Sequence, residues 1–291
     1  MRRPLGQTSI RDALDSALIA LTAAGCETPR LDAEVLLAAA MGVDRAVVVS
    51  DPARPIEPDA ARRFMTYAAR RREREPVAYI LGRKGFRSIE LAVDPRVLIP
   101  RPETEHVVEA VLGPASAGGL ATGCRLAAGA RVCDVGTGSG AIALAIATER
   151  PDLEVLGTDT SAEALAVARA NARRLALDVA FHHGDLLADV AGPLDAIVSN
   201  PPYVEDRAVL APEIACHEPA LALRAGPDGL DVVRRLLPAA GATEASLVVV
   251  EIGAGQAAAV GALIREAGFP DVEVLLDLAG IERVLVGRRS G

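Results

Sequence analysis

The chain has 291 residues, of which 51% are hydrophobic but only 2% are aromatic, and it contains no Trp. Ala, Leu and Val must therefore fill the interior, as in α/β proteins with buried parallel strands, and this composition excludes a disordered chain. The formal net charge is −8, and residues 102–291 hold 26 Asp and Glu against only 14 Lys and Arg. This acidic region counts against a nucleic-acid substrate, since binding phosphates needs cationic side chains.

The cysteines and the apolar segments argue against three further classes. The four cysteines form no C-x-x-C pair, so neither a metal site nor a disulfide framework is expected. They are Cys26, Cys124, Cys133 and Cys216. No apolar stretch is long enough to span a membrane, and Arg11, Asp12 and Asp15 interrupt the segment where a secretion signal would need its apolar core. We expect a cytoplasmic monomer with no metal.

Residues 1–75 are expected to form a small helical domain. Apolar residues recur there at three-and-four spacing, as in Ile10, Leu14, Leu18 and Leu21. A further helix is expected over residues 60–72, and the run Arg70–Arg72 at its end is interpreted as a solvated face.

Residues 76–100 change to short extended runs. Ala78–Leu81 and Ile89–Val93 are apolar and lie around Gly82 and Gly85, which predicts a β-hairpin connector. The Ala- and Gly-rich stretch 113–129 has no clear period and is interpreted as a helix end plus a loop.

Residues 101–291 are expected to form one α/β domain, because strand-like and helix-like runs alternate from Ala130 onward. The expected strands are 132–135, 155–159, 179–181, 196–199, 247–252 and 272–276. The expected helices are 141–149, 162–175, 230–240 and 256–267. Ligands bind such mainly parallel sheets at the carboxyl ends of the strands, near the switch in strand order.

A glycine-rich turn follows the first of these strands. It reads Gly136, Thr137, Gly138, Ser139, Gly140, and its glycines allow a ligand to approach bare backbone. The turn also satisfies G-x-G-x-x-A, so a dinucleotide-binding oxidoreductase is the direct alternative. Asp159 ends the next strand, where a carboxylate can accept both ribose hydroxyls in either class. Asp185 follows the third strand, where it could bond an adenine amino group or simply cap a loop.

The segment Asn200, Pro201, Pro202, Tyr203 follows the fourth strand and separates these alternatives. Two prolines cannot continue a central strand, so the chain must leave the sheet and present an amide oxygen, backbone carbonyls and an aromatic ring. An amide or exocyclic NH2 group can donate to the Asn200 oxygen and the Pro201 carbonyl while Tyr203 packs on its flat face. Because an amide nitrogen is a poor nucleophile, we expect catalysis by positioning and dehydration rather than by a strong base.

Together, the glycine turn and Asn200–Tyr203 resemble class I methyltransferases that act on planar nitrogen. Four further segments narrow the resemblance to the release factor glutamine methyltransferase family, and they cover most of the chain. They are Glu75–Gly82, Leu98–Glu105, Gly138–Leu144 and Glu218-Pro219.

This resemblance implies a Rossmann-like, mainly parallel seven-stranded sheet and S-adenosylmethionine as cofactor. It implies methylation of the glutamine in the Gly-Gly-Gln motif of class 1 release factors. Residues 1–75 are expected to recognise that substrate, because they lie outside the alternating sheet segment and have the opposite charge balance. A glutamine methyltransferase for a ribosomal protein is the nearer alternative, and a non-enzymatic binding module is the more distant one. The implied cofactor-binding residues are Gly136, Thr137, Gly138, Ser139, Gly140, Asp159, Asp185, Leu186 and Asn200. The implied catalytic and substrate-binding residues are Asn200, Pro201, Pro202 and Tyr203.

One position departs from the family pattern. Some members carry Trp after the residue equivalent to Asp185, whereas this chain has Leu186, so adenine stacking would become apolar contact. The family assigns no role to the four histidines, and surface or packing duties are expected for them. They are His106, His182, His183 and His217.

Overall fold

The computed structural model describes residues 8–112 and 126–289, and the chain divides into two compact units. The first unit extends to Gly82 and also contains Leu210–His217, whereas the second contains Arg83–Val209 and Glu218–Gly291. Most of the stretch 113–129, interpreted above as a helix end plus a loop, lies outside the described residues. None of the described helices is both long enough and apolar enough to cross a membrane.

The first unit is helical, as residues 9–72 predict. Its helices are α1 (Ile10–Ala23), α2 (Pro29–Met41), α3 (Arg45–Ser50), α4 (Pro58–Arg72), α5 (Val77–Leu81) and α9 (Pro212–His217). Ser9 caps α1, because its hydroxyl accepts from the Asp12 backbone N–H while the Asp12 carboxylate accepts from the Ser9 N–H. Ile10, Leu36, Leu37 and Phe64 lie in one apolar core that holds α1, α2 and α4 together.

The prediction of an extended run at Ala78–Leu81 is wrong, because these residues form helix α5. Pro76 precedes the helix, and Gly82 ends it in the left-handed conformation at φ 69°. A short apolar run has no period that separates strand from helix, so only its flanking residues could have decided. The hairpin exists but uses β1 (Arg83–Phe86) and β2 (Ile89–Ala92), which pair antiparallel.

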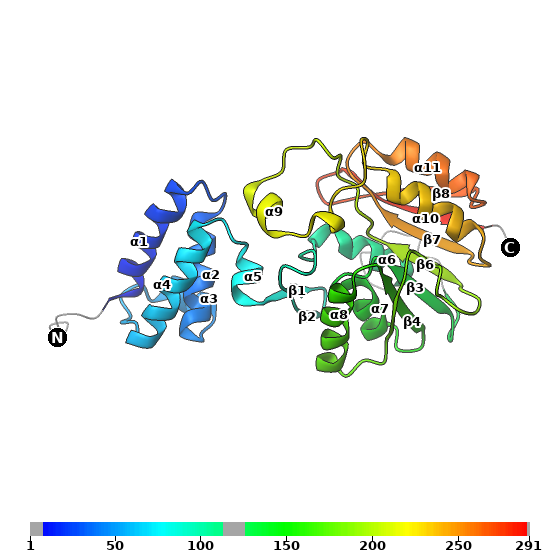
Figure 1. The fold of residues 1–291 in the computed structure, drawn as a ribbon. Helices are drawn as coiled ribbons and strands as arrows, with labels where there is room; N and C mark the ends of the chain where they lie inside the picture. The colour runs from blue at the N-terminus through cyan, green and yellow to red at the C-terminus, as the bar shows by residue number, and fades with distance from the viewer. Residues whose placement is uncertain (1–7, 113–125, 290–291) are drawn as a thin grey trace. The chain divides into compact units, whose positions relative to one another are not determined.

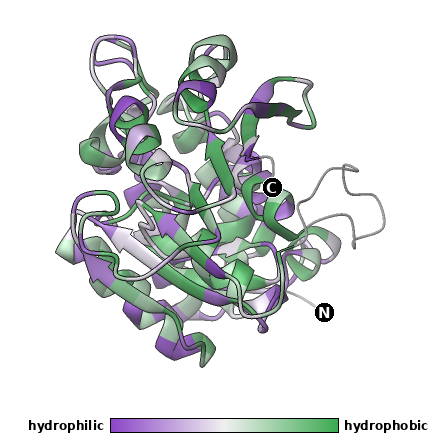
Figure 2. Ribbon diagram, turned by 90° about the vertical axis from the view of Figure 1, so that its right-hand side faces the viewer, coloured by the Kyte–Doolittle hydropathy of each residue, from purple (hydrophilic) through white to green (hydrophobic). Residues whose placement is uncertain are grey.

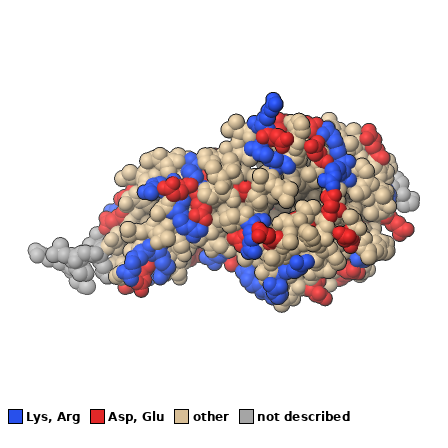
Figure 3. Space-filling view, viewed as in Figure 1, with Lys and Arg blue, Asp and Glu red and all other residues tan. Residues whose placement is uncertain are grey.

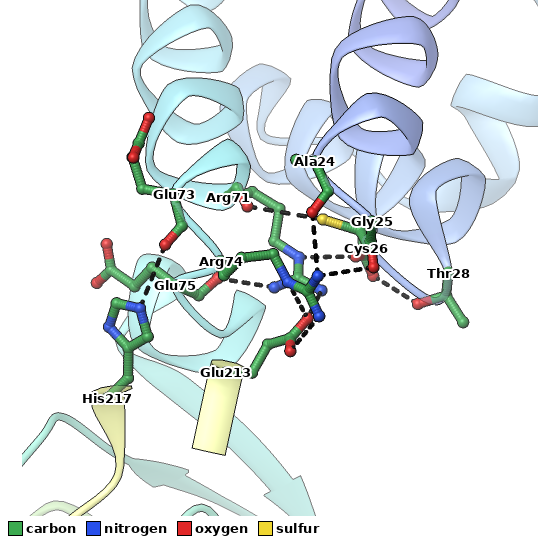
Figure 4. Close-up of polar contacts among 11 residues, drawn as sticks. Ala24, Gly25, Cys26, Thr28, Arg71, Glu73, Arg74, Glu75, Glu213 and His217 are labelled. Carbon is green, nitrogen blue, oxygen red and sulfur yellow. Dashed lines mark hydrogen bonds and ion pairs between the residues drawn. The ribbon is translucent and has the colours of Figure 1, made fainter. Parts of the chain in front are cut away.

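The interpretation of Arg70–Arg72 as a solvated face is wrong for Arg71. This side chain is buried, and its guanidinium donates to Asp32 at 2.8 Å and to Glu213 at 2.9 Å (Figure 4). Arg74 also donates to Glu213, at 2.8 Å from Nε. Glu213 lies 142 residues from Arg71 in the sequence, so no local pattern could have predicted this cluster.

The second unit contains the mainly parallel sheet that the sequence predicts, with the seven strands that the resemblance implies (Figure 1). Its strands are β3 (Arg131–Val135), β4 (Glu154–Asp159), β5 (Ala180–His183), β6 (Ala196–Ser199), β7 (Leu247–Glu251), β8 (Asp271–Leu276) and β9 (Glu282–Arg288). The order is β5-β4-β3-β6-β7-β9-β8, and only β9 runs antiparallel to its neighbours. Strand β9 was not among the expected strands, because its apolar run spans only Val284–Val286.

Helices cover both faces of this sheet. They are α6 (Glu105–Leu112), α7 (Ala141–Glu149), α8 (Ala162–Leu175), α10 (Asp231–Gly241) and α11 (Ala257–Glu266), with two short 3-10 turns, η1 (Pro102–Thr104) and η2 (Ala220–Ala222). In Figure 1, α10 and α11 lie on one side of the sheet and α7 and α8 on the other. The strands of the sheet are largely hydrophobic (Figure 2), as burial on both faces requires.

The strand order places the expected ligand crevice. The chain moves from β3 outward to β4 and β5, and it then returns to pair β6 against the other edge of β3. The carboxyl ends of β3 and β6 therefore flank the switch in strand order, with Val135 opposite Ser199. The glycine turn follows one of these strands and Asn200 follows the other.

Candidate active site

The turn between β3 and α7 exposes bare backbone, as its glycines predict. Gly136 and Gly138 have positive φ, and a Cβ atom added to either would meet no atom within 4 Å. At Gly140, in contrast, an added Cβ would lie 2.9 Å from the Leu144 side chain. The first two glycines therefore leave open space on the crevice side, whereas the third allows close packing of α7.

Asp159 lies at the end of β4 and contacts this turn. Its carboxylate accepts from the backbone N–H of Gly138 at 2.9 Å and from that of Ser161 at 2.8 Å. These two bonds fix the carboxylate while leaving acceptor positions that a diol could use. This is the geometry expected for a ribose-binding acid.

A cavity of about 170 Å³ opens beside these groups. Among the predicted site residues it is lined by Gly136, Asp159, Asp185, Leu186, Pro201 and Pro202. A smaller cavity of about 50 Å³ shares Gly136 and is lined by Thr137, Gly138, Ser139 and Asn200. The structure therefore gathers nearly all predicted positions around one crevice, while Gly140 and Tyr203 line neither cavity and no histidine does.

The two positions after β5 differ in their constraints. Asp185 is exposed and forms an ion pair with Arg235, which also lines the larger cavity and which the sequence did not single out. Leu186 adopts the left-handed conformation at φ 55°, and its carbonyl accepts from the Thr158 hydroxyl at 2.8 Å. Leu186 is thus held against the cavity, where it offers apolar contact.

The segment Asn200–Tyr203 is fixed from both ends. The Ser199 hydroxyl donates to the Val135 carbonyl at 2.7 Å, which ties the end of β6 to β3. The Gln256 side chain donates to the Tyr203 carbonyl at 3.1 Å. The Tyr203 hydroxyl donates to Glu251 at 3.4 Å, and burial together with this carboxylate raises the tyrosine pKa to about 12. Tyr203 therefore remains a neutral phenol at physiological pH.

Asn200 has a partner that the sequence did not reveal. Its side-chain Nδ2 donates to the Thr104 hydroxyl oxygen at 3.0 Å, and the Thr104 hydroxyl hydrogen-bonds to the carboxylate of Glu251. Burial raises the Glu251 pKa to about 7, and its Oε2 has no hydrogen-bond partner among the described residues. Glu251 could have been found, since it lies one residue before the end of the predicted strand 247–252 and ends β7 in the structure.

Asp134, at the base of the glycine turn, was also missed as a site residue. Its Oδ2 accepts from the Thr137 hydroxyl at 2.7 Å and from the Ala143 N–H at 3.2 Å. Its Oδ1 is buried without a partner in the described part of the chain, and burial raises the pKa of this carboxyl to about 7. Asp134 thus holds the glycine turn to the start of α7 through Thr137 and Ala143.

Two of the segments quoted for the resemblance meet in the structure. The Glu218 carboxylate accepts from the Ile99 backbone N–H at 3.1 Å and also from the Arg101 guanidinium. Glu218 is buried, so this pair holds the segment Leu98–Glu105, and with it Thr104, against the rest of the second unit.

On the face shown in Figure 3, Lys and Arg lie interspersed with Asp and Glu rather than apart from them.

Most of the chain is similar to known methyltransferases. Residues 12–82 match the model of the PrmC N-terminal domain, and residues 120–257 match the methyltransferase small domain. A release factor glutamine methyltransferase from Caulobacter vibrioides is 43% identical over 92% of both chains. One from Deinococcus radiodurans is 40% identical over 97% of this chain and 99% of its own.

Solved structures show the same fold at low identity. A methyltransferase from Pyrococcus furiosus is 16% identical, covers 72% of this chain and 92% of its own, and has a TM-score of 0.52. The Thermus thermophilus 16S rRNA N2 G1207 methyltransferase, solved with AdoMet and guanosine, is 20% identical and covers 72% of this chain and 50% of its own, with a TM-score of 0.50. These likenesses establish a class I methyltransferase fold.

Proposed function

Because the chain belongs to the release factor glutamine methyltransferase family, we propose that it methylates the side-chain amide nitrogen of the glutamine in the Gly-Gly-Gln motif of class 1 release factors. The observation that carries this proposal is the similarity over nearly the whole chain, combined with Asn200–Tyr203 beside the glycine turn. A dinucleotide oxidoreductase has no use for such a segment. We place the reaction in the cytoplasm.

The crevice fits S-adenosylmethionine. The open face of Gly136 and Gly138 would accept the amino-acid part, Asp159 the ribose hydroxyls, and Asp185 with Leu186 the adenine. Arg235 pairs with Asp185 at the rim and would keep this carboxylate oriented. When bound, the cofactor supplies a methyl group on a positively charged sulfur.

The chain's own contribution is to orient the substrate amide. Asn200 uses its Nδ2 on Thr104, which leaves its Oδ1 to accept one hydrogen of the substrate NH2 group. The Pro201 carbonyl can accept the other. Two acceptors draw electron density toward the amide nitrogen, and Tyr203 excludes water from one side.

The test is methylation of intact substrate. The protein, S-adenosylmethionine and a class 1 release factor are incubated, and peptides are mapped by mass spectrometry. We expect one added methyl on the Gly-Gly-Gln glutamine and none elsewhere. Methylation of a ribosomal protein or of DNA instead would reject the proposal, as would preferential binding of NAD(H) in calorimetry.

We further propose that the helical unit, residues 1–75 in the sequence-based division, recognises the body of the release factor. A cavity of about 470 Å³ lies in this unit, with Phe64 and the exposed Met65 among its lining residues. Met65→Glu should raise the KM for the intact release factor roughly 10-fold while leaving the KM for a short Gly-Gly-Gln peptide unchanged. Leu278→Glu, at an exposed apolar position in the other unit, is the control. Equal effects on both substrates would contradict this assignment.

A further inference from the structure

Four side chains form one hydrogen-bonded chain behind the catalytic segment. Asn200 Nδ2 donates to Thr104 Oγ1 at 3.0 Å, the Thr104 hydroxyl bonds to the Glu251 carboxylate, and Tyr203 donates to Glu251 Oε1 at 3.4 Å. The residues come from the ends of β6 and β7 and from the turn η1. Thr104 and Glu251 are only 3% and 1% exposed, so water does not compete for these bonds.

The direction of this chain is set by its buried end. Above its pKa of about 7 Glu251 is ionised, so its carboxylate donates no hydrogen bond and accepts the one that the Thr104 hydroxyl donates. The Thr104 oxygen must then act as acceptor toward Asn200, and only the Nδ2 of that amide can donate to it. Asn200 Oδ1 is thereby directed away from Thr104.

The opposite orientation would defeat the reaction. If the Asn200 amide turned over, it would present its NH2 group to the NH2 group of the substrate, and two donors would face each other. An asparagine amide has no intrinsic preference between these two states, because oxygen and nitrogen are nearly equal in size. A neighbouring group must choose between them.

We propose that Thr104 and Glu251 are positioning residues that lock the Asn200 amide with Oδ1 toward the substrate glutamine. This inference rests on the proposed function for its substrate, but the locked amide is a property of the enzyme alone. Arg283 does not take the place of Thr104 and Tyr203 as a hydrogen-bond donor to Glu251, because its guanidinium donates to Asp277 at 3.2 Å. The negative charge of Glu103 raises the pKa of Glu251, whereas the hydrogen bonds from Thr104 and Tyr203 lower it.

The orientation of the Asn200 amide can be measured in the enzyme without any substrate. The chain contains only two asparagines, Asn171 and Asn200, so selective 15N-asparagine labelling gives two side-chain NH2 signals in an NMR spectrum. Asn200→Ala identifies the Asn200 pair by its loss. Thr104→Val should shift that pair and speed its exchange with water by about 10-fold or more, and Thr104→Ser should restore both. Asn171, bonded to the Ala92 and Ser139 carbonyls, is the internal control.

A double-mutant cycle tests the consequence for methyl transfer. Thr104→Val should lower the single-turnover rate about 10- to 100-fold, and Thr104→Ser should stay within about 3-fold of the parent. In the Asn200→Ala background, Thr104→Val should change the rate by less than about 3-fold, because Thr104 acts through Asn200. Thr148→Val removes a hydroxyl bonded to the Leu144 carbonyl elsewhere in this unit and is the matched control.

Two outcomes would overturn the inference. One is an unchanged Asn200 signal in folded Thr104→Val protein. The other is a double variant, Thr104→Val with Asn200→Ala, whose loss of rate equals the product of the losses in the two single variants. Such a result would show that Thr104 acts independently of Asn200. Failure of the parent protein to methylate any release factor would instead reject the proposed function, and the NMR signals would still decide whether the amide is locked.

Discussion

The two units bury charged side chains in opposite ways. In the helical unit, Arg71 is surrounded by Asp32 and Glu213, and Arg74 adds a second cation to Glu213. In the sheet unit, Asp134 and Glu251 are fully or almost fully buried, and each keeps one carboxylate oxygen without a partner among the described residues.

The pKa values record this difference. Burial opposes ionisation of Glu213, but the hydrogen bonds from Arg74 and Arg71 outweigh it and lower its pKa to about 2. Burial dominates at Asp134 and Glu251 and raises both pKa values to about 7. The charge of Glu213 is neutralised by two arginines, whereas Asp134 and Glu251 belong to the class of strongly perturbed buried carboxyls that cluster at functional sites.

The largest effect on stability is expected from removing Arg71, the buried cation of the helical unit. Arg71→Ala leaves Asp32 buried without its partner, which should reduce the free energy of unfolding by about 3–5 kcal/mol. Urea unfolding measures this change. Arg72→Ala, one residue along the helix and exposed, should stay within about 0.5 kcal/mol of the parent. Similar losses from both variants would show that the cluster is not a structural joint.

The next effect concerns the sheet unit and should spare stability. Asn200→Ala removes one acceptor, so the single-turnover methyl transfer rate at saturating cofactor should fall roughly 100-fold or more. Calorimetric binding of S-adenosylhomocysteine should weaken only several-fold, and far less than in Asp159→Ala. Thermal melts control for folding. Near-normal transfer by folded Asn200→Ala protein would contradict the proposed orientation of the amide.

The pH dependence of stability should have opposite signs for the two clusters. Folding raises the Asp134 pKa from 3.8 to about 7, so the stability that this group contributes is present at acid pH and is lost as pH rises through 7. Folding lowers the Glu213 pKa from 4.5 to about 2, so its contribution is present above 4.5 and is lost as pH falls toward 2.

Melting curves of two variants measure these contributions. Relative to the parent, Asp134→Asn should gain stability on going from pH 5 to pH 8, by on the order of 1–3 kcal/mol. The deficit of Glu213→Gln should shrink as the pH is lowered below 4.5. If the stability of both variants relative to the parent changed with pH in the same direction, the two clusters would not differ in the way proposed.

The smallest effect is expected at an exposed pair. Asp185 and Arg235 are both more than half exposed, so water screens their attraction. Arg235→Ala should change the free energy of unfolding by less than about 1 kcal/mol while loosening the Asp185 rim of the cavity. A larger loss of unfolding free energy, measured by chemical unfolding, would show that this pair contributes to stability as the buried cluster of the helical unit does.

Sequence reasoning succeeded where local signals are strong. Helices 141–149 and 162–175 have the expected bounds, because a glycine turn precedes one and the Ser161 cap begins the other. The predicted residues that line the crevice were also reachable, since each lies at or just after the end of an expected strand.

What escaped depends on contacts between distant residues. Thr104 carries no local mark of its bond to Asn200, and nothing around Glu213 announces its pairing with Arg71. The strand β9 escaped because its apolar run is short and its place is set by pairing with β7 and β8.

The position of Glu213 also has a consequence for the order of folding. Synthesis proceeds from the N-terminus, so α1, α2 and α4 leave the ribosome long before the segment Leu210–His217 exists. Until then Arg71 and Arg74 lack their shared carboxylate, and the helical unit can only be partly consolidated. Its completion waits for the chain to pass through the first four strands of the sheet in sequence order. A nascent chain stalled before residue 210 should therefore be cleaved by protease in its helical unit more readily than the released protein.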